Sequence, residues 1–305
     1  MPYGDIILRS FGIALRHKYL WLVALFSGET GGNVSFNYTT PTNGTPDVGA
    51  LQDRATNWVS LHIGLIAAFA AVSVVVAIAF FILGAVCEGA TIRASAEHDA
   101  DRPFGLRLAW AMGVHTVWVM LRFRLLLLAL YLPVLLFAVA WLVGLFIAFL
   151  HQAIGVLLTL VFGGLLLFVV FFVYALYLLF LDRFGSRAVI LEERNALPAI
   201  ARAHRLLFKR FGRSLLVLVL SLAIAFAVTI VLGCFSSLLF VPLLLAAYPT
   251  PSAASPAVWA VLIVTAVALV PIYFVVGGFL AAQSSTYWTL AFRRIDLDYA
   301  AAMPR

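Results

Sequence analysis

The sequence is poor in charged residues and in cysteine, and each shortage excludes a class of protein. Only 11% of the 305 residues are charged, whereas soluble domains have about a quarter charged. Hydrophobic residues make up 64% of the chain, against about half in a soluble domain, and this excess must face lipid. The two cysteines, Cys87 and Cys234, lie at the end of one apolar run and deep inside another, which argues against a structural disulfide and against a cysteine metal site.

Recognisable catalytic and metal-binding motifs are also absent. The six histidines are scattered, no two of them are four residues apart, and the chain has no HExxH, GxSxG or phosphate-binding glycine loop. The stretch with Glu97, His98, Asp99 and Asp101 has residue types that bind metals, but we interpret it as a solvated helix start. We therefore expect a non-enzymatic protein with no catalytic residues, no cofactor and no metal site.

Five apolar runs are long enough to cross a membrane, for which a helix needs about 20 residues. They are Trp58–Val86, Leu125–Leu150, Ala153–Leu181, Leu215–Ala247 and Ala257–Ala282. Charged residues are absent from the interior of these runs, which argues against an ion-coupled pump. Glu88, just after the first run, is the nearest exception. The runs predict an all-α polytopic membrane protein with a single integral membrane domain over residues 1–305.

The basic residues lie on one side of the predicted spans. Of the 20 Lys and Arg residues, all except Arg54 lie in alternate connecting segments, namely Met1–Lys18, Cys87–Arg124, Asp182–Arg213 and Phe292–Arg305. By the positive-inside rule these segments are cytoplasmic. Both termini are then cytoplasmic, which requires an even number of crossings.

A sixth crossing would have to use the short apolar segment Tyr19–Ser27. Nine residues make a helix of only about 14 Å, half of what a span needs. We therefore predict about six transmembrane helices, the first of them short or interrupted within residues 19–38. A re-entrant dip that does not cross is the alternative.

The cytoplasmic segments resemble one another and predict a threefold repeat. Pro103–Arg124 and Pro198–Arg213 each begin with a proline that follows acidic residues and precedes an arginine by four positions, and Asp5–Lys18 is a fainter version. Each unit would be an amphipathic helix followed by an outgoing and a returning span. The alternative is that any alternating membrane chain has basic loops before its spans. The predicted units cover residues 3–98, 99–183 and 187–292.

The third of these segments has the pattern of an interfacial helix. In Ile200–Phe211 the apolar residues recur at spacings of three and four, so they share one side of a helix. Such a helix can lie at the headgroup level and bind anionic lipid or a partner protein, or it can be a topology signal that packs under the bundle. The candidate binding residues are Arg107, Arg202, Arg205, Lys209, Arg210 and Arg213.

Small residues four positions apart predict close helix contacts in lipid, either within the bundle or between subunits. Three such pairs are Ala85 and Gly89, Gly277 and Ala281, and Gly278 and Ala282.

One motif carries a resemblance to known proteins. The stretch LEERNALPAIARAHRLLFKRFGR, with a span on either side, resembles a group of uncharacterised bacterial six-span integral membrane proteins. These are similar to the membrane domain of membrane-anchored glycerophosphodiester phosphodiesterases. The resemblance implies six helices in a bacterial plasma (inner) membrane. It does not imply phosphodiesterase activity, because the catalytic domain of those enzymes is a separate barrel for which this chain has no length.

These observations favour a non-enzymatic membrane subunit that scaffolds or stabilises a larger complex. Its expected partners are anionic lipids of the cytoplasmic leaflet and other membrane subunits, or further copies of the chain. Nucleic acid is not expected, because the basic residues lie at membrane edges rather than in one patch. The alternative is a transporter or permease-like component for a lipid or other apolar solute, with the interrupted first segment lining the route.

Overall fold

The computed structural model describes residues 3–28, 48–151, 154–247 and 256–301, and these residues are largely helical. These residues form eight helices and no strand, which confirms the all-α fold predicted from the sequence. In chain order the helices are α1 (Tyr3–Arg16), α2 (Tyr19–Leu25), α3 (Val48–Asp99), α4 (Leu106–Leu150), α5 (Ile154–Leu191), α6 (Ala196–Lys209), α7 (Phe211–Ala247) and α8 (Pro256–Ala301).

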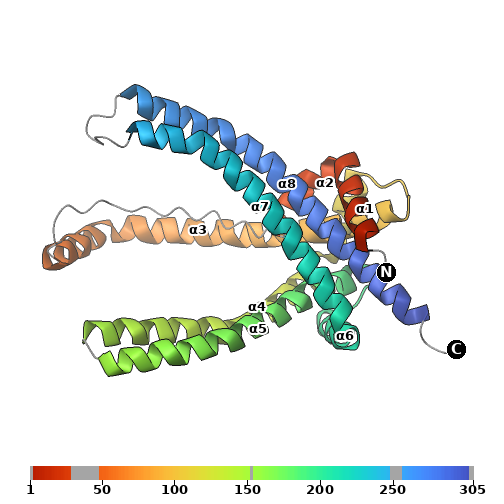
Figure 1. Cartoon of the computed structure of the whole chain (residues 1–305), viewed down its shortest axis with the longest axis horizontal. Coiled ribbons are helices and arrows are strands. Elements are labelled where there is room, and N and C mark those ends of the chain that lie inside the picture. The colour runs from red at the N-terminus through yellow and green to blue at the C-terminus, as the bar shows by residue number, and fades with distance from the viewer. Residues whose placement is uncertain (1–2, 29–47, 152–153, 248–255, 302–305) are drawn as a thin grey trace.

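Five of these helices, α3, α4, α5, α7 and α8, are long and apolar enough to cross a membrane. Their distal parts form three arms, because there α3 stands apart, α4 lies beside α5, and α7 lies beside α8 (Figure 1). The arms diverge at one end and converge at the other, where α1, α2 and α6 lie (Figure 1). We call the convergent end the base. The protein is therefore a multi-pass membrane protein whose arms are the candidate spans.

The long helices extend well beyond the apolar runs. The 45 residues of α4 make a rod of about 68 Å, more than twice the roughly 30 Å of bilayer hydrocarbon. The predicted amphipathic helix Pro103–Arg124 is therefore not a separate element, because its residues from Leu106 onward are the first turns of α4. The helix begins after Gly105, which is extended (φ −113°, ψ 169°), and Pro103 lies in the preceding loop rather than in the first turn of the helix.

The corresponding segment of the third predicted unit does form its own helix. The α6 helix ends at Lys209, and Arg210 (φ −130°, ψ 38°) separates it from α7. The α1 helix is likewise separate from α2. The three predicted units thus differ in one respect, because the amphipathic segment of the second unit is continuous with its span. The threefold repeat stays a prediction.

The α2 helix is the element on which a sixth crossing would depend. It has seven residues, a length of about 10 Å, and the chain turns at Gly28, where φ is +77°. Leu20 and Ala24 of α2 are fully buried, in a cluster with Ala281 and Ala282 of α8. The structure thus holds α2 against the base part of α8. Most of the predicted crossing, residues 19–38, lies outside the described residues, so the sixth span stays a prediction.

The base has a core of its own. Trp288 of α8 is 2% exposed and lies edge-on to Phe184 of α5, with 5.8 Å between the ring centroids. Its neighbour Tyr287 donates a hydrogen bond of 2.9 Å from its hydroxyl to the Val217 carbonyl of α7. Ile6 of α1 is buried in the same cluster. The base therefore ties together helices from all parts of the chain and fixes the arms at one end.

Candidate functional site: the charged base

The charged side chains of the base form links between helices. Asp99, in the last turn of α3, accepts hydrogen bonds from two arginines. The Nε of Arg9 in α1 lies 2.8 Å from Oδ1 of Asp99, and the Nη1 of Arg293 in α8 lies 2.8 Å from Oδ2. The Asp99 carboxylate therefore connects three helices, namely α1, α3 and α8. These pairs are partly exposed, so each contributes modestly to stability.

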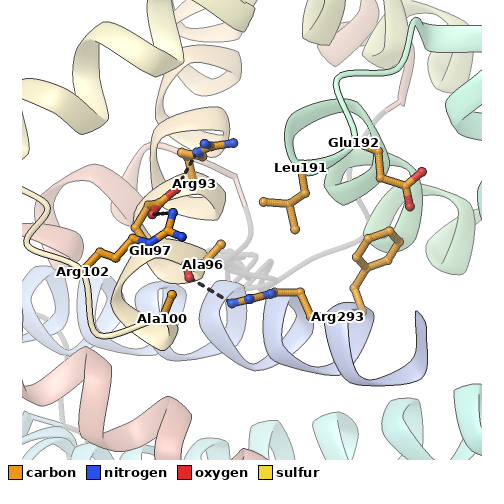
Figure 2. Close-up of a pocket in the computed structure, with 9 residues that line it drawn as sticks. Arg93, Ala96, Glu97, Ala100, Arg102, Leu191, Glu192 and Arg293 are labelled. Atoms are coloured by element: carbon orange, nitrogen blue, oxygen red, sulfur yellow. Dashed lines mark hydrogen bonds and ion pairs between the residues drawn. The ribbon is translucent and has the colours of Figure 1, made fainter. Parts of the chain in front are cut away.

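A cavity of about 310 Å³ opens beside this link, and we call it the base cavity (Figure 2). Glu97 pairs with two arginines (Figure 2). Its Oε1 lies 3.1 Å from Nε of Arg93, and its Oε2 lies 3.3 Å from Nη1 of Arg102. On the other side of the base cavity, Oε1 of Glu192 lies 3.2 Å from Nε of Arg202 in α6. The lining has paired charges of both signs, so it offers a polar binding surface. It is lined by Arg93, Ala96, Glu97, Ala100, Arg102, Leu191, Glu192, Phe292 and Arg293.

A second cavity, of about 330 Å³, lies where α3 meets α4 and α5, and we call it the fork cavity. Its dominant feature is a buried ion pair. Arg124 of α4 donates from Nε and Nη2 to Oε2 of Glu88 in α3, at 3.0 Å and 2.5 Å. The same Nη2 donates to the carbonyls of Ser27, after α2, and Gly84, at 2.8 Å and 3.2 Å. The cavity is lined by Ser27, Gly28, Phe81, Glu88, Arg124, Leu127, Leu128, Tyr131, Asp182 and Arg183.

Two histidines meet at the junction of α1 and α2. The rings of His17 and His98 are stacked with 3.5 Å between their centroids. The Tyr19 hydroxyl lies 2.7 Å from Nε2 of His98 and donates to the Phe104 carbonyl at 3.2 Å. His98 is thus in contact with aromatic side chains, and Asp99 beside it is occupied by arginines. The predicted solvated helix start is a packed junction instead, since His98 is only 8% exposed.

Acidification should loosen this junction. Burial, and next the positive charge of Arg16, lower the pKa of His17 below its usual value of about 6.5. The folded protein therefore favours the neutral His17 ring. This favourable contribution to the free energy of unfolding is fully present above the usual pKa of about 6.5, and it is lost as the pH falls through the lowered pKa of the folded protein. We expect the thermal unfolding midpoint in detergent to fall between pH 8 and pH 5. The His17→Phe variant should lose less stability over this range than the wild type.

The control for this prediction is His115→Phe, which changes an exposed histidine of α4. That variant should keep the wild-type dependence on pH. If His17→Phe also kept it in full, the stacked pair would have no part in the acid sensitivity.

The predicted lipid- or partner-binding residues are distributed around α6 and the start of α4. Arg205, Lys209 and Arg107 are exposed, whereas Arg202 is half-buried and pairs with Glu192. The apolar side of α6 is covered by the base, with Ala203, Leu206 and Leu207 buried in its core. The structure therefore matches the alternative in which α6 packs under the bundle, and it leaves the basic side outward. Arg210, between α6 and α7, and Arg213, in the first turn of α7, are partly exposed.

The predicted small-residue pairs lie at two helix crossings. A Cβ added to Gly278 would lie 2.6 Å from the Trp21 carbonyl oxygen of α2, so the backbones of α2 and α8 touch there. Gly277 has ordinary clearance, 3.7 Å from Leu25, and Ala281 and Ala282 are buried beside α2. At the other crossing, Ala85 is fully buried, and a Cβ on Gly89 would lie 2.9 Å from Oγ1 of Thr116 in α4. Both crossings join helices of one chain.

Sequence reasoning missed a fully buried arginine. Arg187 of α5 is 0% exposed and donates from Nη2 to the Ser285 carbonyl of α8 at 3.3 Å, and from Nη1 to the Arg183 carbonyl at 3.1 Å. It was grouped with the basic cytoplasmic residues, although the apolar residues Ala188–Leu191 after it continue the helix. That continuation is the signal that α5 extends beyond Leu181.

Comparison with known proteins places the chain in a family. A protein-family model matches residues 10–290, which include four of the five candidate spans in full and most of the fifth. The chain belongs to the family of unknown function DUF7544. No curated protein and no solved structure matches this DUF7544 protein. Since the family description has no activity, the resemblance to the membrane domains of glycerophosphodiester phosphodiesterases stays a prediction.

Proposed function

We propose that this DUF7544 protein is a non-enzymatic membrane subunit that scaffolds a larger complex, with its arms open to the transmembrane helices of other subunits. One observation supports the proposal above the others. In the most apolar window of each candidate span, only 0 to 12% of the residues are buried within the chain. A self-contained bundle would bury one face of each span against its neighbours.

The base and the arms differ in a way that fits this role. The base has its own aromatic core, whereas large side chains such as Phe69 and Val75 of α3, Phe146 of α4 and Val267 of α8 are 62 to 72% exposed. In a membrane these faces are covered either by lipid or by other helices. A protein whose base holds three separated arms provides long apolar faces at fixed spacing, which suits the assembly of several partners around one chain.

The proposed location is the plasma (inner) membrane of a bacterium, with the base and both termini in the cytoplasm. The support is the charge distribution, because the arginines of the base lie on the side that the positive-inside rule assigns to the cytoplasm. The arginines and lysine of α6 then face the cytoplasmic leaflet, where anionic lipids or a partner protein can meet them.

The test is photocrosslinking from the arms. A photoreactive amino acid at Val75, Phe146 or Val267 should crosslink to a second protein chain in native membranes, because these side chains face outward from the arms. The same residue at Leu8 of α1, which is 75% exposed but in the base, is the control and should not give that product. Native mass spectrometry in mild detergent should then show a stable complex, and its mass distinguishes a homo-oligomer from a heteromer.

A solitary monomer whose arm positions crosslink only to lipid would contradict the scaffold proposal. It would favour the second candidate, a transport component for a lipid or other apolar solute. The specific observation behind that candidate is the fork cavity, which places charged side chains at the point where the apolar arms diverge.

A further inference from the structure

The fork cavity lies where three spans end together. Its charged residues lie next to the ends of three apolar runs. Glu88 comes two residues after the run in α3. Arg124 immediately precedes the run in α4, and Asp182 immediately follows the run in α5. In a bilayer this level is the boundary between hydrocarbon and headgroups. The cavity is therefore at the depth of a phospholipid headgroup in the leaflet beside the base.

The charges of the fork cavity balance. Arg124 and Glu88 form the buried pair on one side, with side chains that are 18% and 6% exposed. Asp182 and Arg183, adjacent in α5, supply one charge of each sign on the other side, and both are partly exposed. A site with a carboxylate beside a guanidinium suits a ligand that itself carries a cation and an anion close together.

Apolar side chains complete the cavity on the side of the arms. Phe81 of α3 and Leu127 and Leu128 of α4 line it, and Leu128 is 56% exposed. Beyond them, the exposed faces of α3 and α4 continue as apolar surface, including Phe80 and Leu132. A ligand with a dipolar head and long apolar chains would find a matching surface for each part, whereas a soluble ion would use only the head.

We propose that the fork cavity binds the headgroup of a zwitterionic phospholipid with a free amine. Arg183 binds the phosphate, since guanidinium groups pair well with phosphate oxygens. Asp182 accepts hydrogen bonds from the ammonium group, which a trimethylated amine cannot donate. The acyl chains lie along α3 and α4. This inference is independent of the scaffold proposal, because a subunit with or without partners can hold such a lipid.

The test is lipid titration by native mass spectrometry on the delipidated full-length protein. The probes are phosphatidylethanolamine, phosphatidylcholine and phosphatidylglycerol with the same acyl chains. Wild-type protein should bind phosphatidylethanolamine about fivefold more tightly than the other two, the effect of one added ionic contact. Asp182→Asn should remove this preference without weakening phosphatidylglycerol binding. Arg183→Gln should weaken all three lipids by about fivefold.

Two charge-matched controls lie away from the cavity. Asp101→Asn changes a carboxylate whose side chain is 89% exposed, at a positive φ that asparagine tolerates. Lys18→Gln removes an exposed cation. Both should keep the wild-type preference. If either control abolished the preference, or if Asp182→Asn retained it, the assignment of the fork cavity would be wrong.

A third variant tests the cavity without changing its charges. Leu128→Trp places a larger side chain at the exposed wall, and it should reduce binding of all three lipids while the thermal unfolding midpoint stays near wild type. Unchanged lipid binding in this variant would overturn the proposal. Soluble phosphoethanolamine should not bind at the same concentrations. Equal affinity for it would show a site for a soluble metabolite and would likewise overturn the lipid assignment.

Discussion

Replacing Gly113 with alanine is expected to destabilise the crossing of α3 and α4. A Cβ at this position would lie 2.3 Å from the Val86 carbonyl oxygen and 3.1 Å from the Cβ of Ala90. The nearest atom belongs to the backbone of α3, so no side-chain rotation relieves the clash and the two helices must move apart. Overpacking of this kind costs about 1–3 kcal/mol or more. The measurement is the thermal unfolding midpoint in detergent, which should fall clearly.

Gly144→Ala is the matched control on the same helix. A Cβ at Gly144 would lie 3.9 Å from the nearest atom, Cδ1 of Leu160, which is an ordinary contact. Alanine is also the better helix former by about 1 kcal/mol, so this variant should be neutral or slightly more stable. Equal losses in the two variants would show that the change of residue type, rather than the approach of α3, explains the effect.

The importance of Gly113 shows what the sequence could and could not predict. The five apolar runs were sufficient to predict the all-α fold and the candidate spans, because length and hydropathy alone decide whether a helix can cross a bilayer. Gly113 was missed because the segment Pro103–Arg124 was interpreted as a separate interfacial helix. Gly113 lies four residues after Ala109, so the two form a small-residue pair of the same kind as the pairs predicted to lie at helix contacts.

The candidate site was less predictable, for two physical reasons. The pairs Glu88–Arg124 and Asp99–Arg293 are separated by 36 and 194 residues, and their distances depend on how the helices meet in the base. The spans are apolar on every side, so nothing in their pattern says which face is covered. The divergence of the three arms therefore became visible only in the structure. Glu88, just after the first apolar run, lies in an ion pair with Arg124 that the sequence pattern does not indicate.

Removing the carboxylate of that pair is expected to have the largest effect on stability. In Glu88→Ala, Arg124 would keep its carbonyl contacts but lose the carboxylate that receives two of its donors. Breaking a buried ion pair by removing one partner typically costs about 3–5 kcal/mol, because the remaining charge stays desolvated. Since Arg124 also binds the Ser27 carbonyl, the loss should loosen α2 as well. The measurements are the unfolding midpoint and amide hydrogen exchange in α2.

Two further variants separate the charge from the packing. The Glu88→Leu, Arg124→Met double variant should recover part of the lost stability, because it removes the unpaired charge and fills the space with apolar groups. Asp5→Ala breaks the exposed pair with Arg294, at 3.4 Å, and should cost less than about 1 kcal/mol. A double variant less stable than Glu88→Ala would mean that the hydrogen bonds of Arg124 to the Ser27 and Gly84 carbonyls outweigh the cost of its charge. In that case Arg124 would stabilise the fork chiefly as a hydrogen-bond donor to the backbone, and Glu88 would serve to orient it.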